Sequence, residues 1–273
     1  MKRVVSVNDL SGTGRCSLYV AISIMSALGV SCVPLPTAIL SNQTGVAGFS
    51  FLDFTDQMKP YLSAWEKQGQ VFDNIHTGFL TGKSQLKLVM EFIDRFASRD
   101  ANIVIDPVMA DDGELYPVYD MEYAQMMREL CKKATILTPN VTELFFLANS
   151  SSRDTSREGL ISLMEKIKSQ KTREIFVTGV VAGDKIKTIY YNCTSKVYKE
   201  IVSSYNGKSY SGTGDIFSSI ISALVARGKD SLFAAEKAAE FISMVAKETQ
   251  KQNGDTREGI LFEEHLKELT KID

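Results

Sequence analysis

Short apolar segments alternate along the chain with longer segments in which apolar residues recur every three or four positions. Arg3–Val7, Ser31–Leu35 and Ile175–Val177 are runs rich in β-branched or apolar residues, typical of buried strands. Apolar residues at helical spacing over 18–28 predict a helix that ends at Gly29. Strands that alternate with helices predict a mostly parallel sheet covered on both faces.

The same alternation continues through the middle of the chain. Ile103–Ile105 and Thr135–Leu137 are predicted as further short buried strands, each after a helix-like segment. Ser84 is expected to cap a helix whose apolar face begins at Leu86.

After Val177 the pattern changes. Lys185–Asn192 and Lys196–Ser203 alternate between apolar and polar residues, which predicts a hairpin. Three helices are then expected: Asp215–Ala226, Leu232–Lys247 and Leu261–Leu269. Asn149–Arg157 is polar but short, so we interpret it as a loop and expect residues 1–273 to form a single domain.

Composition excludes several classes of protein. The 31 basic and 33 acidic residues among 273 give a net charge of −2, which argues against a nucleic-acid-binding protein. The two histidines exclude a multi-histidine metal site. The uncharged stretch Cys16–Leu52 contains serines, glycines and prolines, so we expect a buried helix and strand rather than a membrane span. Four widely spaced cysteines predict reduced, mostly buried thiols in a cytoplasmic protein.

Two glycine-containing motifs suggest nucleotide binding, but each is incomplete. Gly12–Ser17 has Ser17 in place of the third glycine of a dinucleotide fingerprint, and the acidic residue expected about 20 positions later is absent. We therefore rank a nicotinamide oxidoreductase last, although a turn that brings backbone close to a small ligand stays open. The segment 82–84 resembles the end of a P-loop, but Thr77 stands where that loop needs glycine.

The sharpest signal is the segment Ser211–Asp215, which precedes an apolar stripe at helical spacing. A glycine-rich turn at a helix start points free backbone N–H groups at one place, and the helix dipole favours an anion there. Asp215 would then lie beside a bound phosphate, where a general base for an attacking hydroxyl is needed. A simple first-turn acid is the alternative, but two glycines flanking Thr213 exceed what capping needs.

A second cluster lies at the predicted start of another helix. Thr138 is expected as the N-cap and Pro139 as the first helical residue. Asn140 and Glu143 would then share a face and suit a hydrated Mg²⁺ that carries nucleotide phosphates. A plain helix start explains these residues equally well.

Two more polar groups follow predicted strands. Asp106 ends the strand Ile103–Ile105, at the edge of the sheet where α/β proteins bind ligands, although a turn aspartate before proline is the simpler explanation. Ser41–Gly45 is a polar cluster inside the uncharged stretch, and its side chains could bind a small polar ring.

Together these motifs resemble the ribokinase-like superfamily and, within it, the pyridoxal, pyridoxine and pyridoxamine kinases. The matching segments are Val7–Asp9, Ser41–Gly45, Thr77–Phe79, Asp106–Met109, Thr138–Asn140 with Glu143, Val177–Gly179 and Gly212–Asp215. The last is specific for the superfamily, and Ser41–Gly45 points to the pyridoxal branch. The resemblance implies a three-layer α/β/α sandwich with a mostly parallel central sheet. It also implies ATP-dependent phosphorylation of the 5′-hydroxymethyl group of a vitamin B6 vitamer, with Mg²⁺, a monovalent cation such as K⁺, and a homodimer.

The resemblance assigns roles residue by residue. Asp215 corresponds to the general base, and the anion hole corresponds to Gly212, Thr213 and Gly214. Nucleotide contacts correspond to Asp106, Asn140, Glu143, Thr178 and Gly179. The Mg²⁺ group corresponds to Asp111 and Glu143, and contacts to the substrate ring correspond to Asp9, Leu40, Thr44 and Phe79.

Three substitutions in the expected substrate pocket depart from the pyridoxal kinase pattern. Asp9 replaces a serine, Gln43 replaces a histidine, and Phe79 replaces a tyrosine while keeping a stacking face. Asp9 favours a hydroxymethylpyrimidine (phosphate) kinase as the alternative, whereas Ser41–Gly45 disfavours it. A non-catalytic B6 carrier would bind vitamers without releasing ADP, and the intact Gly212–Asp215 motif argues against it.

Overall fold

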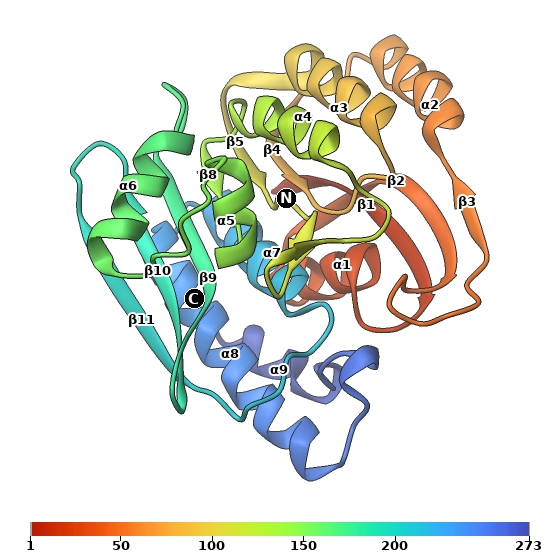
Figure 1. The fold of residues 1–273 in the computed structure, drawn as a ribbon. Helices are drawn as coiled ribbons and strands as arrows, with labels where there is room; N and C mark the ends of the chain where they lie inside the picture. The colour runs from red at the N-terminus through yellow and green to blue at the C-terminus, as the bar shows by residue number, and fades with distance from the viewer. Residues whose placement is uncertain (1, 273) are drawn as a thin grey trace.

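The computed structural model describes residues 2–272, and within them one sheet of nine strands dominates the fold (Figure 1). Its strands are β1 (Arg3–Thr13), β2 (Ser31–Asn42), β3 (Phe51–Asp53), β4 (Phe72–Thr77), β5 (Ala97–Ile105), β8 (Ile136–Leu137), β9 (Glu174–Ala182), β10 (Lys185–Asn192) and β11 (Tyr198–Ser204). They are arranged in the order β11-β10-β9-β8-β5-β4-β1-β2-β3. The run from β9 to β2 is parallel, while β3, β10 and β11 pair antiparallel at the two edges.

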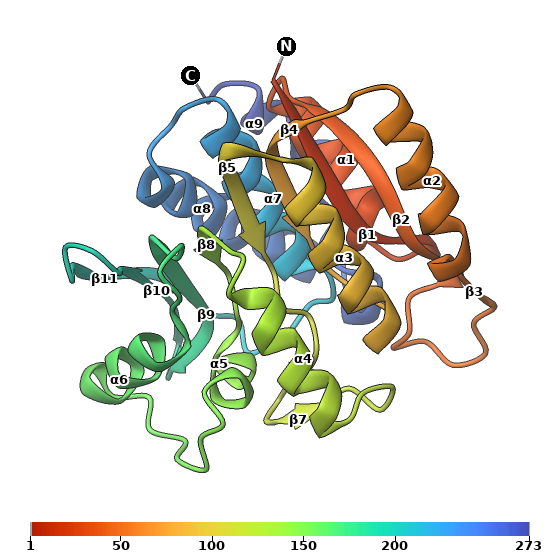
Figure 2. The same ribbon diagram turned by 90° about the horizontal axis from the view of Figure 1, so that it is seen from above.

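Helices cover both faces of this sheet (Figures 1 and 2). One apolar core lies under α1 (Ser17–Ala27), α7 (Thr213–Ala226), α8 (Ser231–Lys251) and α9 (Leu266–Leu269). The opposite core lies under α2 (Thr55–Lys67), α3 (Lys83–Phe96), α4 (Met121–Cys131), α5 (Val141–Leu147) and α6 (Arg157–Ile167). A small hairpin, β6 (Ala110–Asp111) and β7 (Glu114–Leu115), follows β5. The predicted three-layer α/β/α sandwich with a mostly parallel sheet is confirmed.

Helix α7 is almost entirely buried, and this burial fixes the position of its first turn. Ile216, Ile220, Ile221 and Leu224 are fully shielded from solvent. The helix packs across β1, β4 and β5 and between α1 and α8. Its N-terminus therefore lies at the carboxyl end of the parallel strands, where open α/β sheets bind their ligands.

Most predicted elements occur, some with different bounds. The helix ending before Gly29, whose φ is +72°, and the hairpin of β10 and β11 are confirmed. Strands β1 and β2 run further than the expected ends at Val7 and Leu35. The expected helix Leu261–Leu269 is wrong in extent, because a 3₁₀ turn over Glu263–His265 precedes the short α9.

The prediction that Ser84 caps a helix is wrong. Helix α3 begins at Lys83 and its N-cap is Gly82, whose backbone is extended. Ser84 lies inside the first turn, where a hydroxyl cannot take the N-cap position.

In the described part of the chain the four cysteines are free, as predicted, and Cys32 is more exposed than Cys16, Cys131 and Cys193. Burial raises the pKa of the Cys32 thiol to about 12 and that of Cys193 to about 11, so these thiols are not ionised at neutral pH. Over residues 2–272, no helix is both long and apolar enough to cross a membrane.

Candidate active site

The carboxyl group of Asp215 lies in the first turn of α7 and is held from both sides. Its Oδ1 accepts a hydrogen bond of 3.1 Å from Asn8 Nδ2, and its Oδ2 accepts one of 2.9 Å from the backbone N–H of Ser17. Burial raises the pKa of Asp215 to about 6, and the charge of Asp9 adds to this increase, while the two donors oppose it. The group is therefore ionised at neutral pH and still basic enough to accept a proton.

Gly212 allows the turn before Asp215 to form. Its φ is +75°, in the left-handed region, and a Cβ there would lie 1.8 Å from the carbonyl oxygen of Arg15. The backbone N–H groups of Thr213, Gly214 and Asp215 begin α7 and have no intrahelical acceptors. Because the helix dipole adds positive potential at this end, the turn can bind an anion directly beside the Asp215 carboxylate.

In the turn Gly12–Ser17 the backbone N–H of Ser17 donates to Asp215, so this donor is not free for a phosphate. Arg15 anchors the turn: its N–H donates to Glu258 O at 2.9 Å, and its Nε lies 2.7 and 2.8 Å from the two carboxylate oxygens of Glu263. The glycines predicted a turn that could bring backbone close to a small ligand, and in the structure the Ser17 N–H of this turn approaches the Asp215 carboxylate.

Asn8 is the main site residue that sequence reasoning missed. It is fully buried in β1 and donates to Asp215, while its Oδ1 accepts from the N–H groups of Asp9 (3.0 Å) and Phe79 (2.8 Å). Gly78 leaves room for it, since a Cβ at that position would lie 2.3 Å from Asn8 Nδ2. The available signal was an amide next to the apolar residue Val7, at the end of the predicted strand.

Two further carboxyl groups of the predicted site, those of Asp106 and Glu143, are buried. Asp106, directly after β5, accepts a hydrogen bond of 3.2 Å from Ser218 Oγ, and its pKa is raised by burial and by the charge of Asp215. The pKa of Glu143, in α5, is raised by burial and by the charge of Asp106. A Cβ on Gly214 would lie 3.7 Å from Asp106 Oδ2, and the N–H of Met109 donates to Glu143 Oε1 at 3.1 Å, so the turn after β5 contacts both the start of α7 and α5.

The expected N-cap at Thr138 is wrong, because Asn140 caps α5. Asn140 Oδ1 accepts from the N–H of Glu143, and Glu143 Oε2 accepts from the N–H of Asn140, each at 2.8 Å. This reciprocal pair satisfies two free N–H groups at once. Glu143 Oε1 also accepts from Met109 N–H at 3.1 Å, so Glu143 links α5 to the turn after Asp106.

Thr178 and Gly179 lie beside this capped helix. The N–H of Thr178 donates to Pro139 O at 3.0 Å, and Thr178 forms an isolated bridge with Asn140. Gly179 has a φ of +77° within β9. Thr178 and Gly179, in the middle of β9, thus lie beside Asn140, which follows the end of β8.

The predicted ring contacts divide into two groups. Asp9 is buried and accepts a hydrogen bond of 2.8 Å from Ser11 Oγ, and burial raises its pKa. Phe79 is half-buried, with its ring centroid 6.0 Å from that of Tyr119. The backbone N–H groups of both residues donate to Asn8 Oδ1, and Asn8 Nδ2 donates to Asp215. Leu40 is buried in β2 and Thr44 is exposed in the following loop, so their role as ring contacts stays a prediction.

The acidic residues fit a loosely held divalent ion rather than a protein cage. Across the residues that the structure describes, no three His, Cys, Asp or Glu side chains gather in a metal-binding arrangement. Asp111 is exposed in β6, and its Oδ1 accepts from the N–H of Asp112. Mg²⁺ commonly keeps several waters and binds through one or two carboxylates together with substrate phosphates. The donors present fit an ion of this kind.

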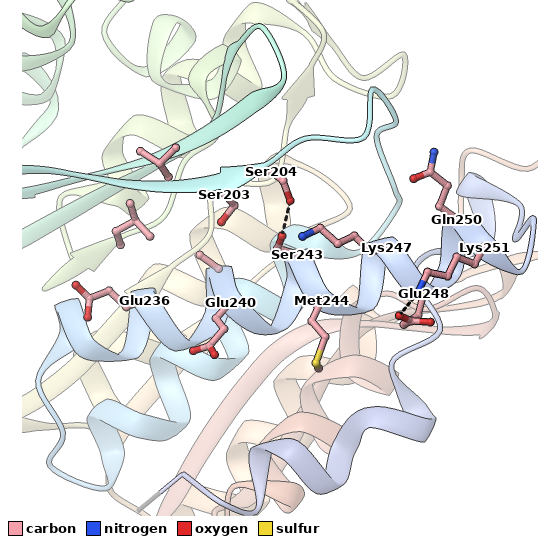
Figure 3. Close-up of a pocket in the computed structure, with 13 residues that line it drawn as sticks. Ser203, Ser204, Glu236, Glu240, Ser243, Met244, Lys247, Glu248, Gln250 and Lys251 are labelled. Carbon is pink, nitrogen blue, oxygen red and sulfur yellow. Dashed lines mark hydrogen bonds and ion pairs between the residues drawn. The ribbon is translucent and has the colours of Figure 1, made fainter.

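A separate groove of about 850 Å³ lies between β11 and α8 (Figure 3). Ser204 and Ser243 face each other across it with their hydroxyl oxygens 3.2 Å apart, and Lys247 and Lys251 lie along the helical side. Its lining includes none of the predicted site residues.

A family model for phosphomethylpyrimidine kinase matches residues 20–258. The chain belongs to this family. The match includes Asp106, Glu143 and the Gly212–Asp215 turn, whereas Asn8, Asp9 and Ser17 lie before its first residue. The expectation of a ribokinase-like kinase is confirmed.

A solved structure from Bacteroides thetaiotaomicron, provisionally described as a phosphomethylpyrimidine kinase, is 40% identical with a TM-score of 0.94 and covers 98% of this chain and 93% of its own. A second crystal form from that organism, with pyridoxal, gives 39% identity, a TM-score of 0.92 and coverage of 98% and 95%. Pyridoxine kinase of Bacillus subtilis is 31% identical over 65% of each chain.

Proposed function

We propose that this chain transfers the γ-phosphoryl group of ATP to the 5′-hydroxymethyl group of a vitamin B6 vitamer: pyridoxal, pyridoxine or pyridoxamine. The observation that carries the proposal is the Asp215 carboxylate beside the free N–H groups of the Gly212 turn. The relatives named pyridoxine kinase and the 39% identical structure with pyridoxal support the choice of substrate.

In the proposed reaction the vitamer hydroxyl oxygen attacks the γ-phosphorus of ATP. The new O–P bond forms as the bond to ADP breaks, and the hydroxyl proton passes to Asp215. The backbone N–H groups of Gly212, Thr213, Gly214 and Asp215 stabilise the charge on the transferred oxygens. Positioning and charge stabilisation of this kind account for most of the catalysis in phosphoryl transfer.

The nucleotide is proposed to lie at the ends of β5 and β8 and beside the middle of β9, in contact with Asp106, Asn140, Glu143, Thr178 and Gly179. Asp111 and Glu143 would hold a hydrated Mg²⁺, which supplies positive charge to the phosphates. The hydroxyl of Thr138 is buried and lacks a hydrogen-bond partner among the described residues, which supports a nearby monovalent cation such as K⁺.

On the substrate side, Asp9, Leu40, Thr44 and Phe79 are proposed to contact the ring. Phe79 offers an aromatic face, and Asp9 offers a carboxyl group in place of the usual serine. A carboxyl group there also suits an aminopyrimidine, and a match to the phosphomethylpyrimidine kinase family supports that reading as well. Hydroxymethylpyrimidine is therefore the second candidate substrate.

The deciding experiment measures ADP release with Mg-ATP and each of four alcohols: the three vitamers and hydroxymethylpyrimidine. Turnover of a vitamer that is lost in Asp215→Asn supports the proposal, because a general base contributes about 10²–10⁴-fold to rate. Turnover of the pyrimidine alone would replace it with the second candidate. Vitamer binding without ADP release would identify a carrier protein.

We also propose that two copies of the chain form a dimer through the β1–β2–β3 edge. Leu10, Ile39 and Leu52 are paired neighbours across the three strands and are 39, 42 and 58% exposed. Paired residues point to the same face, so the three form an exposed apolar row. Sedimentation of the wild type and of Ile39→Lys tests this: a dimer that becomes a monomer in the variant supports it, and a monomeric wild type contradicts it.

A further inference from the structure

A string of buried polar side chains crosses the core beneath the Asp215 turn. Ser6 Oγ lies 3.1 Å from His76 Nδ1, and His76 Nε2 lies 3.0 Å from Ser218 Oγ. Ser218 Oγ in turn lies 3.2 Å from Asp106 Oδ2. Ser6, His76 and Ser218 are fully buried and Asp106 is 6% exposed. The reaction proposed above uses Asp106 but assigns no role to the other three.

Polar side chains such as these are seldom found fully buried in the core of a protein. Its members come from four different segments, β1, β4, α7 and the turn after β5, so the string spans the sheet and the helix packed on it. Buried polar groups cost stability unless every one of them is hydrogen-bonded. Apolar side chains would fill the same space without the cost of burying polar groups, so packing alone does not explain why polar residues are present here.

The direction of the hydrogen bonds depends on where His76 carries its proton. Burial lowers the pKa of His76 to about 4, so the ring is neutral at pH 7, with one nitrogen as donor and the other as acceptor. With the proton on Nε2, Ser6 donates to Nδ1, Nε2–H donates to Ser218, and the Ser218 proton is left for its two acceptors, Gly214 O and Asp106 Oδ2. With the proton on Nδ1, Ser218 must donate to His76 instead.

The first direction is favoured because it satisfies more acceptors. The Ser218 hydroxyl then donates both to Gly214 O at 2.9 Å, in the first turn of α7, and to Asp106 Oδ2 at 3.2 Å, whereas the second direction leaves both oxygens without this donor. A Cβ on Gly214 would lie 3.7 Å from Asp106 Oδ2, which places this carboxylate directly against that turn.

We propose that His76 and Ser218 are positioning residues: His76, protonated on Nε2, directs the hydroxyl proton of Ser218 to Asp106 and so fixes this carboxylate against the anion-binding turn of α7. The inference rests on the proposed function, since it concerns how the carboxylates beside the phosphate site are oriented. Neither His76 nor Ser218 contacts substrate in this scheme; both act through Asp106.

The first test reads the tautomer of His76 directly by ¹H–¹⁵N NMR of the imidazole groups in the intact protein at pH 7. The chain has two histidines, so a His265→Gln variant assigns the remaining signal to His76. We expect the Nε2–H tautomer. The Nδ1–H tautomer would reverse the string, leave Asp106 without this donor, and overturn the proposal. This measurement does not depend on which alcohol the enzyme phosphorylates.

The second test compares steady-state kinetics of four variants. Ser218→Ala should lower kcat by about 10- to 100-fold with the vitamer KM changed less than about twofold, because a bond to a charged group is lost away from the ring site. His76→Gln places an amide donor where Nε2 was and should retain most activity. His76→Asn places its amide where Nδ1 was and should lose as much as Ser218→Ala.

Ser219→Ala is the matched control. Ser219 is the next residue of α7, is fully buried, and its hydroxyl has no partner among the described residues. Its loss should leave kcat unchanged. Equal losses in Ser218→Ala and Ser219→Ala, or equal rates for the Gln and Asn variants of His76, would overturn the proposal. A wild type that phosphorylates none of the tested alcohols would instead contradict the proposed function, and the tautomer would still decide this inference.

Discussion

The pKa of Asp215 predicts how the activity depends on pH. Burial and the charge of Asp9 raise this pKa to about 6, so the basic form predominates above pH 6 and is lost as the pH falls. At pH 5 about one tenth of the molecules carry the ionised carboxylate, and kcat/KM should be about tenfold below its plateau. An ordinary aspartate would keep the plateau down to about pH 5 and reach its midpoint near pH 4.

The assay should measure the phosphorylated vitamer directly, because coupling enzymes have pH profiles of their own. The vitamer ring also ionises, so the profile needs a control that changes Asp215 alone. Asp9→Asn removes a charge that raises the pKa of Asp215 and should move the acid limb to lower pH, whereas ionisation of the vitamer stays where it is. A midpoint near pH 4 in the wild type, or a limb that does not move in the variant, would refute this reasoning.

Three further predictions concern residues around the turn. Asp215→Asn should raise the free energy of unfolding by about 1 kcal/mol at pH 7. Removing a carboxylate whose pKa is raised to about 6 stabilises the folded state by about 3 kcal/mol, and losing one hydrogen-bond acceptor costs about 2 kcal/mol. Urea unfolding at pH 7 and pH 3 tests this, and a gain in stability that persists at pH 3 contradicts it. Gly212→Ala should abolish turnover, because the added Cβ would collide with Arg15 O. The control is Gly228→Ala, where φ is also positive (+84°) but the space is open; it should lower the free energy of unfolding by about 1 kcal/mol and keep turnover. Similar turnover rates for the two variants would refute the steric argument. Glu263→Gln should lower the free energy of unfolding by less than about 1 kcal/mol, because its ion pair with Arg15 is partly exposed. If the loss of stability is the same in 1 M NaCl, the charge is not its cause.

The fold could be predicted where the information is local. The periodicity of Asp215–Ala226 and the alternation of Lys185–Asn192 each specify an element, and chain order then specifies a parallel sheet with an antiparallel edge. The anion-binding turn was predictable for the same reason, since Gly212 to Asp215 are consecutive. A helix start needs little tertiary information.

The predictions failed where two local rules compete or where partners are distant. Pro139 favours Thr138 as the cap, but the reciprocal bonds of Asn140 and Glu143 satisfy more N–H groups, so the helix begins later. Asn8 and Ser17 could not be assigned to Asp215, because their bonds to it span 207 and 198 positions and leave no periodic signal. The site residues in consecutive motifs could therefore be predicted from the sequence, but the hydrogen bonds that join distant residues to Asp215 could not.

The long separation between Asp215 and its partners has a consequence for how the protein is made. A ribosome adds about 5–20 residues per second, so roughly 10–40 s pass between the emergence of Ser17 and that of Asp215. During that time the nascent chain can form much of the sheet, yet it lacks both the base and the anion-binding turn. A nascent chain that has not yet reached Asp215 therefore cannot transfer a phosphoryl group, however much of the sheet it has formed. Activity requires α7 to dock onto strands that were synthesised earlier.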